Sequence, residues 1–513
     1  MSRINNNVNS LIAQRILGQQ NAGLSKSLER LSTGLKINRG ADNPAGLIAS
    51  EVLRSEKASI ASALDNASRA DQIVNVAEGG LQEINSLLIE VQSLVSQTAN
   101  DAGVSLDEKE ANQQQVDAIL QTIDRIASTT SFQGTKLLNG AFDFTTSAQA
   151  SEVTSFQVNG AKLGNDNTVV QATVTQSAQH AGLLLSLGGT SLDLSTTNPT
   201  FTFDLAGTLG NRSFSFTSGT ATSAIAAQVN TFSDSTGVSA AVSGNGIVFK
   251  TTEFGSAEFV SIDITDHGDQ SGGVALLTAT DEATATATGF TALSAVASPV
   301  RDDGQDIGAT INGVAARGNG IKASVASDVL DVEVTFTSAG YQQTGSIDLF
   351  TLTGGGATFQ LGPTVNTENQ VTLGIGNVAA RELGTTTVDN LDTTTNTRFP
   401  TLQAALDDLG SGKALNLVDG SLTDAQKIVN NAITDVSKLR GRLGSFQSNV
   451  VGSSINALSV AFENISAAES SIRDTDFAAE TAELTRSQIL VAAAGNVLQI
   501  ANSQPQSVLG LIG

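Results

Sequence analysis

The stretch "LSTGLKINRGADNPAGLIAS", residues Leu31 to Ser50, ends one helical pattern and starts another. Before and into it, leucines recur at the four- and three-residue spacings of a coiled-coil seam: Leu24, Leu28, Leu31 and Leu35. Three residues typical of turns then interrupt the pattern: Asn38, Gly40 and Asp42. Asn43 suits a helix N-cap, and Pro44 suits the first helical position, where its missing N–H costs nothing. The stretch therefore predicts a joint between two helices.

The chain after the joint predicts two more helices. A helix from Pro44 to Ala99 would be about 80 Å long at ~1.5 Å per residue. Ser105 and Glu108 have the spacing of a capping box, and they precede a second amphipathic pattern. Its apolar positions are Val116, Ile119, Ile123 and Ile126.

The C-terminal part mirrors this order. A seam at spacings of four and three is formed by Val451, Ile455, Leu458, Phe462 and Ile465. A polar break follows, and its joint residues are Arg473, Asp474 and Asp476. An apolar pattern then repeats every seven residues, at Phe477, Leu484, Val491 and Leu498. Antiparallel pairing of the two chain ends would bring both breaks to one level.

The two terminal helices carry only narrow apolar stripes. A pair of helices buries little surface by itself, so we expect these stripes to find partners on other molecules. The alternative is a closed bundle of long helices within one chain.

Between the helical ends the apolar pattern changes to a period of two. Alternating runs separated by Gly, Ser and Thr predict short antiparallel strands. The runs are "FTFDL" (201–205), "RSFSF" (212–216), "FVSIDI" (259–264) and "LDVEVTF" (330–336). The predicted fold class is therefore multidomain α+β, with a long antiparallel coiled-coil bundle formed by both chain ends and an inserted, mainly antiparallel β region.

Composition limits the function. The 513 residues include 50 acidic and 27 basic side chains, for a formal net charge of −23, which disfavours nucleic acid or an anionic membrane as partner. There is no Cys or Trp, and there are one Tyr and two His. The N-terminus lacks the apolar stretch of a cleaved secretory signal, and no segment has the ~20 apolar residues of a membrane span.

An enzyme or metal site finds little support in the sequence. A metallopeptidase of the H-E-x-x-H type needs two histidines one helical turn apart, whereas His180 and His267 are distant. The acidic stretches "DITDHGDQ" (263–270) and "RDDGQD" (301–306) are interpreted as solvated turns rather than cation sites. We expect no catalytic residue, no cofactor and no metal.

Several motifs at both ends resemble those of bacterial flagellins. The resemblance covers roughly residues 1–144 and 400–513, with the motifs in the order that the family shows. They are "LSTGLKINRGADNPAGLIASEVLRSE", "SFQGTKLLNG", "RGRLGSFQSNV", "ENISAAESSIRDTDFAAETAELTRSQIL" and "QPQSVLGLIG". "TFQLGPTVN" (358–366) resembles the family's β-hairpin, and residues 309–336 resemble a small β module of flagellin inserts, as residues 201–264 do more loosely.

The resemblance implies a structural subunit of the flagellar filament, a helical polymer used for swimming motility. It assigns residues 1–43 and 471–513 to an inner-tube coiled coil, with the leucine and seven-residue seams as polymerisation residues and the two breaks as spoke joints. It assigns residues 44–144 and 354–470 to an outer tube, and residues 145–353 to a surface-exposed β insert of one or two subdomains.

The resemblance also implies partners and a location. They are other copies of the chain, an export chaperone at the C-terminal helix, and the filament cap and hook-associated proteins. The chain would be secreted unfolded through a flagellar channel into the extracellular filament. Two alternatives stay open, namely a hook–filament junction protein and a secreted coiled-coil adhesin or effector.

One helical segment departs from the family pattern. Many flagellins carry Q-R-V-R-E-L in a helix that contacts the vertebrate flagellin receptor. This chain has Ile89, Glu90, Val91, Gln92, Ser93 and Leu94 in its place. Because an arginine fork of donors is replaced by a carboxylate at Glu90, we expect weak receptor recognition. The alternative is that Glu90 is only part of a solvated helix face.

Overall fold

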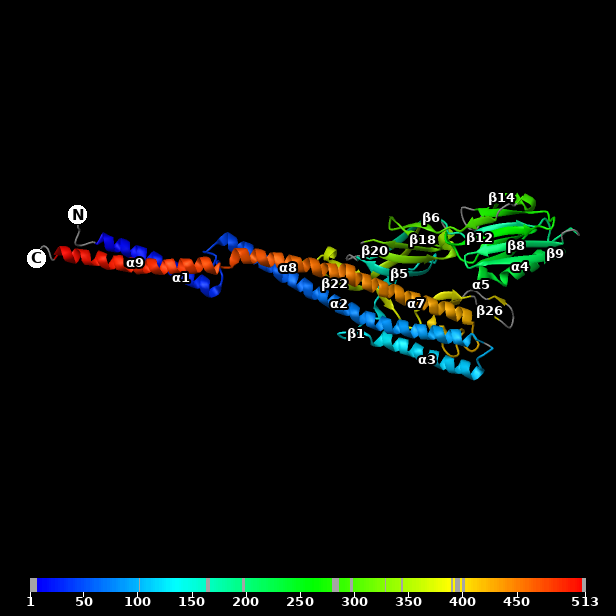
Figure 1. Cartoon of the computed structure of the whole chain (residues 1–513), viewed down its shortest axis with the longest axis horizontal. Coiled ribbons are helices and arrows are strands. Elements are labelled where there is room, and N and C mark those ends of the chain that lie inside the picture. Colours follow the sequence, from blue (N-terminus) through cyan, green and yellow to red (C-terminus); the bar gives the residue numbers. More distant parts are fainter. Residues whose placement is uncertain are drawn as a thin grey trace. The chain divides into compact units, whose positions relative to one another are not determined.

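The predicted α+β architecture is confirmed by the computed structural model, in which long helices form both ends of the chain and strands form most of its middle (Figure 1). The structure describes residues 7–100, 102–162, 167–195, 199–278, 286–295, 299–327, 329–342, 345–388, 391–392, 397–398 and 402–509. The chain forms two compact units. Unit 1 comprises Met1–Val74, Phe359–Gln370 and Leu443–Gly513, and unit 2 comprises Asn75–Thr358 and Val371–Arg442.

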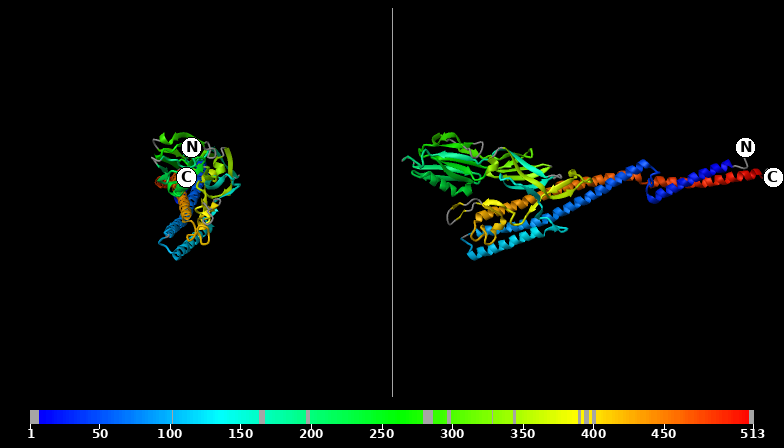
Figure 2. Two further views of the ribbon diagram at one scale, coloured as in Figure 1. Left: turned by 90° about the vertical axis from the view of Figure 1, so that its right-hand side faces the viewer. Right: turned by 180° about the vertical axis from the view of Figure 1, so that it is seen from behind.

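In unit 1 the first and last helices, α1 (Val8–Thr33) and α9 (Phe477–Leu509), lie antiparallel along each other (Figures 1 and 2). Helix α1 ends because Gly34 adopts the left-handed conformation (φ 73°) and donates its N–H to Arg30 O over 2.8 Å. Leu35 therefore lies outside the helix, and its prediction as the last member of a helical seam is wrong.

The joint is followed by a single long helix, α2 (Pro44–Thr98). The predicted cap is confirmed, since Asn43 Oδ1 accepts the Gly46 N–H over 2.9 Å. Within unit 1 this helix packs against α8 (Gly452–Arg473), which follows a π-helical turn, Phe446–Val451. Their shared core contains Ile60, Ala63, Leu458 and the partly buried Leu64, Phe462 and Ile465.

In unit 2 the remainder of α2 belongs to a helical layer with α3 (Leu106–Thr129) and α7 (Leu422–Ser445). The predicted capping box of Ser105 and Glu108 is present at the start of α3. A buried amide ties α3 to the loop before α7, because Gln113 donates to Leu409 O over 2.9 Å and accepts the Leu417 N–H over 2.6 Å. Apolar side chains buried in this layer are Leu81, Ile84, Leu88, Val91, Val116, Ile123, Ile428 and Val436.

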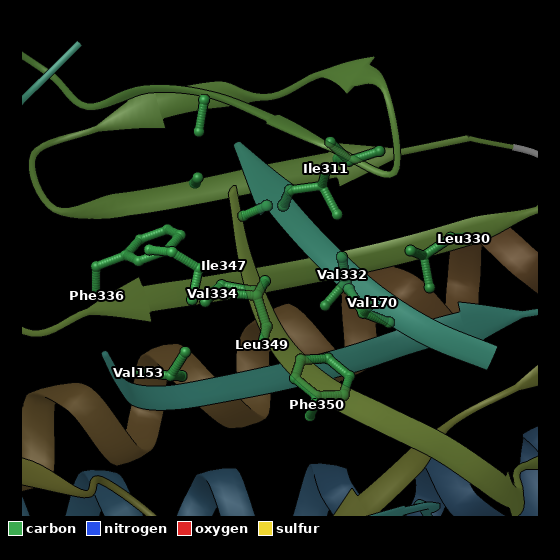
Figure 3. Close-up of a cluster of buried hydrophobic side chains, with 14 of the residues drawn as sticks. Val153, Val170, Ile311, Leu330, Val332, Val334, Phe336, Ile347, Leu349 and Phe350 are labelled. Carbon is green, nitrogen blue, oxygen red and sulfur yellow. The ribbon is translucent and has the colours of Figure 1, made fainter. Parts of the chain in front are cut away.

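The first β module surrounds one apolar core in unit 2 (Figure 3). Its five-stranded sheet has the order β17-β16-β6-β21-β4, and its four-stranded sheet has the order β18-β19-β20-β5. The strands are β4 (Phe144–Ser147), β5 (Val153–Ala161), β6 (Thr168–Gln176), β16 (Gly308–Ile311), β17 (Val314–Ala315), β18 (Arg317–Asn319), β19 (Lys322–Ala326), β20 (Leu330–Phe336) and β21 (Gly345–Gly355). Short helix α6 (Ser338–Gln342) connects the last two.

The second β module is inserted between strands β6 and β16 of the first and has its own apolar core, which includes Leu183, Phe201, Phe203 and Phe249. Its sheets have the orders β10-β11-β7-β13-β14 and β15-β12-β8-β9, all antiparallel. The strands are β7 (Gly182–Ser186), β8 (Thr200–Gly207), β9 (Asn211–Thr217), β10 (Val238–Ser243), β11 (Gly246–Thr251), β12 (Phe259–Asp266), β13 (Gly273–Thr278), β14 (Thr286–Ala292) and β15 (Val300–Asp303). Helices α4 (Thr222–Asn230) and α5 (Ser233–Thr236) connect β9 to β10. The four predicted alternating strands are thereby confirmed as parts of β8, β9, β12 and β20.

Short elements complete the chain. The hairpin loop predicted at residues 358–366 is closed by a Leu361 N–H bond to Asn369 O over 2.9 Å. The short strands are β1 (Ser131–Phe132), β2 (Thr135–Lys136), β3 (Asn139–Phe142), β22 (Ala357–Gln360), β23 (Gln370–Leu373), β24 (Ile375–Asn377), β25 (Thr386–Val388), β26 (Leu391–Asp392), β27 (Thr397–Arg398) and β28 (Leu402–Ala404). The 3₁₀ turns are Leu293–Ala295, Thr367–Asn369 and Leu406–Leu409. The end of the C-terminal motif, residues 510–513, lies outside the described residues.

Candidate assembly surface and joint

The two breaks in the helical patterns meet in unit 1. Leu35 and Asp474 form an isolated antiparallel β-bridge. Beside it, Lys36 N–H donates to Arg473 O over 2.6 Å, and Thr475 N–H donates to Gly34 O over 2.9 Å. Backbone hydrogen bonds therefore hold the two breaks at one level between the helix pairs.

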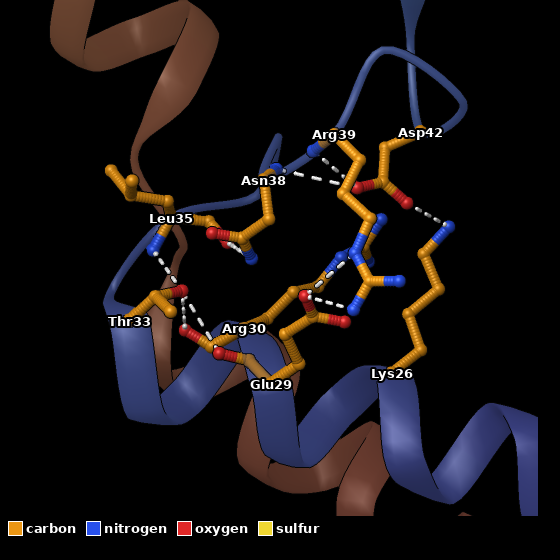
Figure 4. A network of polar contacts seen from close by, with 8 residues as sticks. All are labelled: Lys26, Glu29, Arg30, Thr33, Leu35, Asn38, Arg39 and Asp42. Carbon is orange, nitrogen blue, oxygen red and sulfur yellow. Dashed lines mark hydrogen bonds and ion pairs between the residues drawn. The ribbon is translucent and has the colours of Figure 1, made fainter.

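Asp42 organises the N-terminal side of the joint (Figure 4). Its Oδ2 accepts the N–H groups of Asn38 (3.3 Å) and Arg39 (3.1 Å), and its Oδ1 lies 2.9 Å from Lys26 Nζ on α1. The Lys26 ammonium and these N–H groups lower the pKa of Asp42 to about 2. The loop is thus folded back on α1 around a carboxylate that stays ionised far into acid.

Two more ion pairs attach the joint to helices. Arg39 lies 2.8 Å from Glu29 on α1, and Arg473 lies 2.7 Å from Glu51 on α2. On the C-terminal side, Asp474 accepts the Ser470 hydroxyl (2.6 Å). The sequence pattern found Asn38, Gly40, Asp42, Arg473, Asp474 and Asp476. It missed Lys26, Glu29 and Glu51 on the helices and Arg39 in the loop, because charged residues at such positions carry no distinctive signal.

Asp476 starts the terminal helix. Its Oδ1 accepts the Ala478 N–H over 2.9 Å, so it caps α9. Gly40 lies exposed in the loop between Arg39 and Asp42. All six predicted joint residues therefore belong to the two polar connections.

The seam between α1 and α9 is made largely of small residues. The most buried side chains on these helices are Ser10, Ala13, Ser27, Ser487, Ala494 and Ala501. The predicted seam residues Leu24, Leu31, Leu484, Val491 and Leu498 are half-buried beside them. Leu28 and Phe477 are 50% and 56% exposed, so these two point away from the seam. The sequence pattern pointed to small residues only at "VAAAGNV" (491–497), which contains Ala494, and it missed Ser10, Ala13, Ser27, Ser487 and Ala501 because Ser and Ala do not stand out in a hydrophobic pattern.

Many large apolar side chains on this helix pair remain exposed to solvent. Isolated exposed apolar residues are ordinary, but ten of them on two paired helices leave much apolar surface open to solvent. The set is Val8, Leu11, Ile12, Ile16 and Leu28 on α1, and Phe477, Ile489, Leu490, Val497 and Ile500 on α9.

The segment from Ile89 to Leu94 presents a mixed face in unit 2. Ile89, Glu90 and Ser93 are exposed, whereas Leu94 is buried in the helical layer. Gln92 donates its amide N–H to Asn430 Oδ1 on α7 over 2.8 Å. Contact with a receptor at this face would therefore involve Ile89, Glu90 and Ser93 and exclude Leu94.

A polar pocket of about 520 Å³ lies where the chain passes between the two β modules. Its lining includes His180, Asp302, Asp303 and Asp306. The Asp302 carboxylate accepts the Gly182 N–H over 2.6 Å, and the Asp306 carboxylate accepts the Gly320 N–H over 2.7 Å. Both carboxylates therefore form hydrogen bonds with the nearby backbone. Among the residues that the structure describes, no group of three or more His, Cys, Asp or Glu side chains is placed to hold a metal ion.

The length and apolar character of the helices decide whether any of them could cross a membrane. Over the described part of the chain, no helix combines the length and apolar character that crossing a bilayer requires.

Three family models match the chain. The bacterial flagellin N-terminal helical region matches residues 4–143, and the bacterial flagellin C-terminal helical region matches residues 426–512. The flagellin hook IN motif matches residues 200–253, in the second β module. The first two cover the helical ends that the sequence motifs had indicated.

Curated relatives match nearly the full length. Flagellin B of Helicobacter pylori (strain ATCC 700392 / 26695) is 27% identical over 535 residues, covering 99% of each chain. Flagellin B of Vibrio anguillarum is 28% identical over 510 residues, also covering 99% of each. Among solved structures, FliC from Burkholderia pseudomallei aligns with 74% of this chain and 99% of its own at 14% identity, with a TM-score of 0.23. The relationship rests on the sequences, and by them the chain belongs to the bacterial flagellins, the structural subunits of the flagellar filament.

Proposed function

We propose that the chain polymerises through its terminal helices, residues 1–43 and 471–513, which pack side by side with those of neighbouring copies as an inner tube. The observation that carries this proposal is the set of exposed apolar side chains on α1 and α9. Two paired helices leave such a surface in water, and burying it between copies of the chain supplies a driving force of about 25 cal/mol per Å². A polymer of one chain covers every copy of the surface.

The rest of the chain divides between an outer tube and a projecting insert. Residues 44–144 and 354–470 form the outer tube, and residues 145–353 project from it. The closed cores of the two β modules support this division, because they leave the insert complete without a neighbour. The joint residues from Asn38 to Asp42 and from Arg473 to Asp476 act as spokes between the two tubes.

The test is seeded elongation. Purified chain, heat-monomerised and mixed with filament fragments, should lengthen the fragments. Val497→Glu places a charge on an exposed apolar position and should abolish elongation. Gln499→Glu introduces the same charge two residues away, at an exposed amide, and should elongate normally. Equal elongation by both variants would contradict the proposed surface, and a junction protein or an adhesin would fail to elongate at all.

A second proposed contact is an export chaperone at the C-terminal helix before secretion into the extracellular filament. The half-buried Leu484, Val491 and Leu498 and the exposed Val497 would fill its groove, as helices do in such complexes. A peptide of residues 473–513 titrated with the cognate chaperone should gain helicity on binding. A titration without binding would count against this contact. The cap and hook-associated proteins would meet the same helices at the filament ends.

Recognition by the vertebrate flagellin receptor should be weak. Glu90 is exposed and negative where the family pattern has arginine, and a mispaired charge at an interface costs roughly 2–5 kcal/mol. In a reporter-cell dose response, Glu90→Arg with Gln92→Arg should respond at no more than about a tenth of the concentration that the unsubstituted chain needs. Glu83→Arg, seven residues earlier on the same helix, is the control. The expectation would be overturned if the unsubstituted chain activated the reporter cells as strongly as a flagellin that carries the Q-R-V-R-E-L pattern. It would also be overturned if the double variant activated them no more strongly than the unsubstituted chain.

A further inference from the structure

The seam between α1 and α9 does not define its own register. On α1 the buried and half-buried positions repeat every seven residues, as Ser10, Leu17, Leu24 and Leu31 alternating with Ala13, Gln20 and Ser27. On α9 they repeat as Leu484, Val491 and Leu498 alternating with Ser487, Ala494 and Ala501. Sliding α9 by one heptad, about 10 Å at ~1.5 Å per residue, keeps the seven-residue repeats of the two helices in step, although Ser10 among the large positions and Gln20 among the small ones depart from the size pattern.

The backbone contacts of the joint do not resolve this ambiguity. The hydrogen bonds of Lys36 to Arg473 and of Thr475 to Gly34 join main-chain atoms only. Almost any pair of extended segments can form such bonds, so they carry no information about side-chain identity. A side-chain contact is needed to distinguish the observed register from a slipped one.

Glu480 breaks the repeat. It occupies the position that Ser487, Ala494 and Ala501 occupy in later heptads, yet it carries a carboxylate whose side chain is only 11% exposed. Its Oε2 lies 3.4 Å from Nη1 of Arg30 on α1, whose side chain is 23% exposed. Among the described residues, no other ion pair joins α1 to α9.

We propose that the Arg30–Glu480 pair is the register lock of the terminal helices. In a slipped register the Glu480 carboxylate would be held in the seam against an apolar or small residue, without its cation. A single polar residue at a seam position is a well-attested way to fix the register of a coiled coil. Ser10 Oγ, which donates to Asn502 Oδ1 over 2.6 Å, supports the same register at the far end of the pair.

This proposal rests on the proposed function, because the register of α1 against α9 matters most where many identical helix pairs pack together. A wrong register in one subunit displaces its exposed apolar side chains by a heptad relative to those of its neighbours. The lock therefore selects the subunits that can extend a filament.

Engineered cysteines can report the register, because the chain has no cysteine of its own. A Cβ at Gly23 would lie 3.9 Å from Ser487 Oγ, within reach of a disulfide after small adjustments. Gly23→Cys with Ser487→Cys reports the observed register. Gly23→Cys with Ala494→Cys reports a slip of one heptad. Each pair is introduced into the full chain and oxidised both in solution and after co-assembly with excess unsubstituted protein, so that poorly elongating variants still enter filaments.

Four backgrounds test the lock. Glu480→Ala, which restores the small residue of the repeat, should raise slip cross-linking at least about fivefold. Arg30→Glu should lower native cross-linking and seeded elongation, and Arg30→Glu with Glu480→Arg should restore both. The control exchanges Glu483 and Arg486, an exposed ion pair of 3.5 Å whose two members both lie on α9. This exchange should change neither cross-linking nor seeded elongation.

The outcomes separate this proposal from the proposed function. Slip cross-linking that is unaffected by Glu480→Ala, or a charge swap that fails to rescue Arg30→Glu, would overturn the lock. Failure of the unsubstituted chain to elongate seeds would contradict the filament role, while the cross-links in the unassembled chain would still decide the register.

Discussion

The terminal helix pair and the second β module differ in how far they bury their large apolar side chains. In the β module, Phe201, Phe203 and Phe249 are completely buried within one core. On α9, Phe477, Ile489 and Val497 are each more than half exposed. A sheet pair can enclose its side chains between two layers, whereas two helices meet along one narrow seam. The comparison shows which part of the chain encloses its apolar residues and which part leaves them exposed.

Removal of either terminal helix is the strongest way to break this comparison. Chains lacking residues 1–38 or residues 477–513 should remain folded, because neither core cluster of the β modules lies in these segments. They should lose polymerisation completely, since the exposed apolar surface disappears with the helices. Sedimentation after seeding measures the result, with circular dichroism as the control for folding. Pelletable filaments from a truncated chain would contradict the assignment.

A core substitution in the β module should have the reverse effect. Phe203 is fully buried, and its ring lies 5.5 Å from that of Phe214 and 5.9 Å from that of Phe249. Phe203→Ala should lower the free energy of unfolding of the insert by about 3–5 kcal/mol because it leaves a cavity. Seeded elongation at temperatures below the unfolding of the insert should be unchanged.

The matched control is Phe290→Ala, which removes the same ring from a position that is 59% exposed. It should change the free energy of unfolding by less than about 0.5 kcal/mol. Loss of elongation in Phe203→Ala with a folded insert would show that the module contributes to assembly.

The sequence predicted the places where helices begin more accurately than the surfaces where they meet. Asn43, Pro44 and the Ser105–Glu108 capping box act locally, so their spacing was sufficient. Leu35 was assigned to a helix because its spacing fits, but the left-handed Gly34 ends the helix first. Helix termination here depends on a backbone conformation that hydrophobic spacing does not report.

The seam and the joint were harder to predict because their specificity lies in pairs distant in sequence. Arg30 meets Glu480, and Gln92 meets Asn430, only after the chain has folded. The alternating strands were recognised, yet their division into two nested modules follows from strand pairing, which alternation alone does not fix.

A smaller effect is expected at the joint in acid. The pKa of Asp42 is lowered to about 2 from an ordinary value of about 3.9, so its carboxylate stabilises the fold above pH 4. That contribution is lost as the pH falls from about 4 to 2. Asp42→Asn should lower the melting temperature of the chain at pH 7, and the difference from the unsubstituted chain should close by about pH 2.

Asp65→Asn, at an exposed position on α2, serves as the control and should show no such pH-dependent difference. Thermal unfolding followed by circular dichroism at pH 2, 4 and 7 gives the comparison. A difference that persists unchanged at pH 2 would mean that Asp42 stabilises the joint by shape rather than by charge.

Deletion of the insert should have the smallest effect on assembly. The ends to be joined are adjacent, since Gly356 N–H donates to Asp143 O over 3.1 Å. A chain joining Asp143 to Gly354 should elongate seeds with a critical concentration within about threefold of normal, because the terminal helices keep their exposed apolar side chains. The small remaining loss in assembly arises on α7, where Lys438 loses its ion-pair partner Glu333, which lies 3.7 Å away.

A second, nested deletion joins Gln179 to Gln305, whose backbones exchange two hydrogen bonds of 2.9 Å. It removes only the second module and keeps the Lys438–Glu333 pair, so this chain should elongate seeds like the full chain. If the larger deletion folds and fails to elongate while the nested one succeeds, the first β module belongs with the helical regions in assembly, and the boundary between closed and open surfaces lies at residue 179 rather than at residue 145.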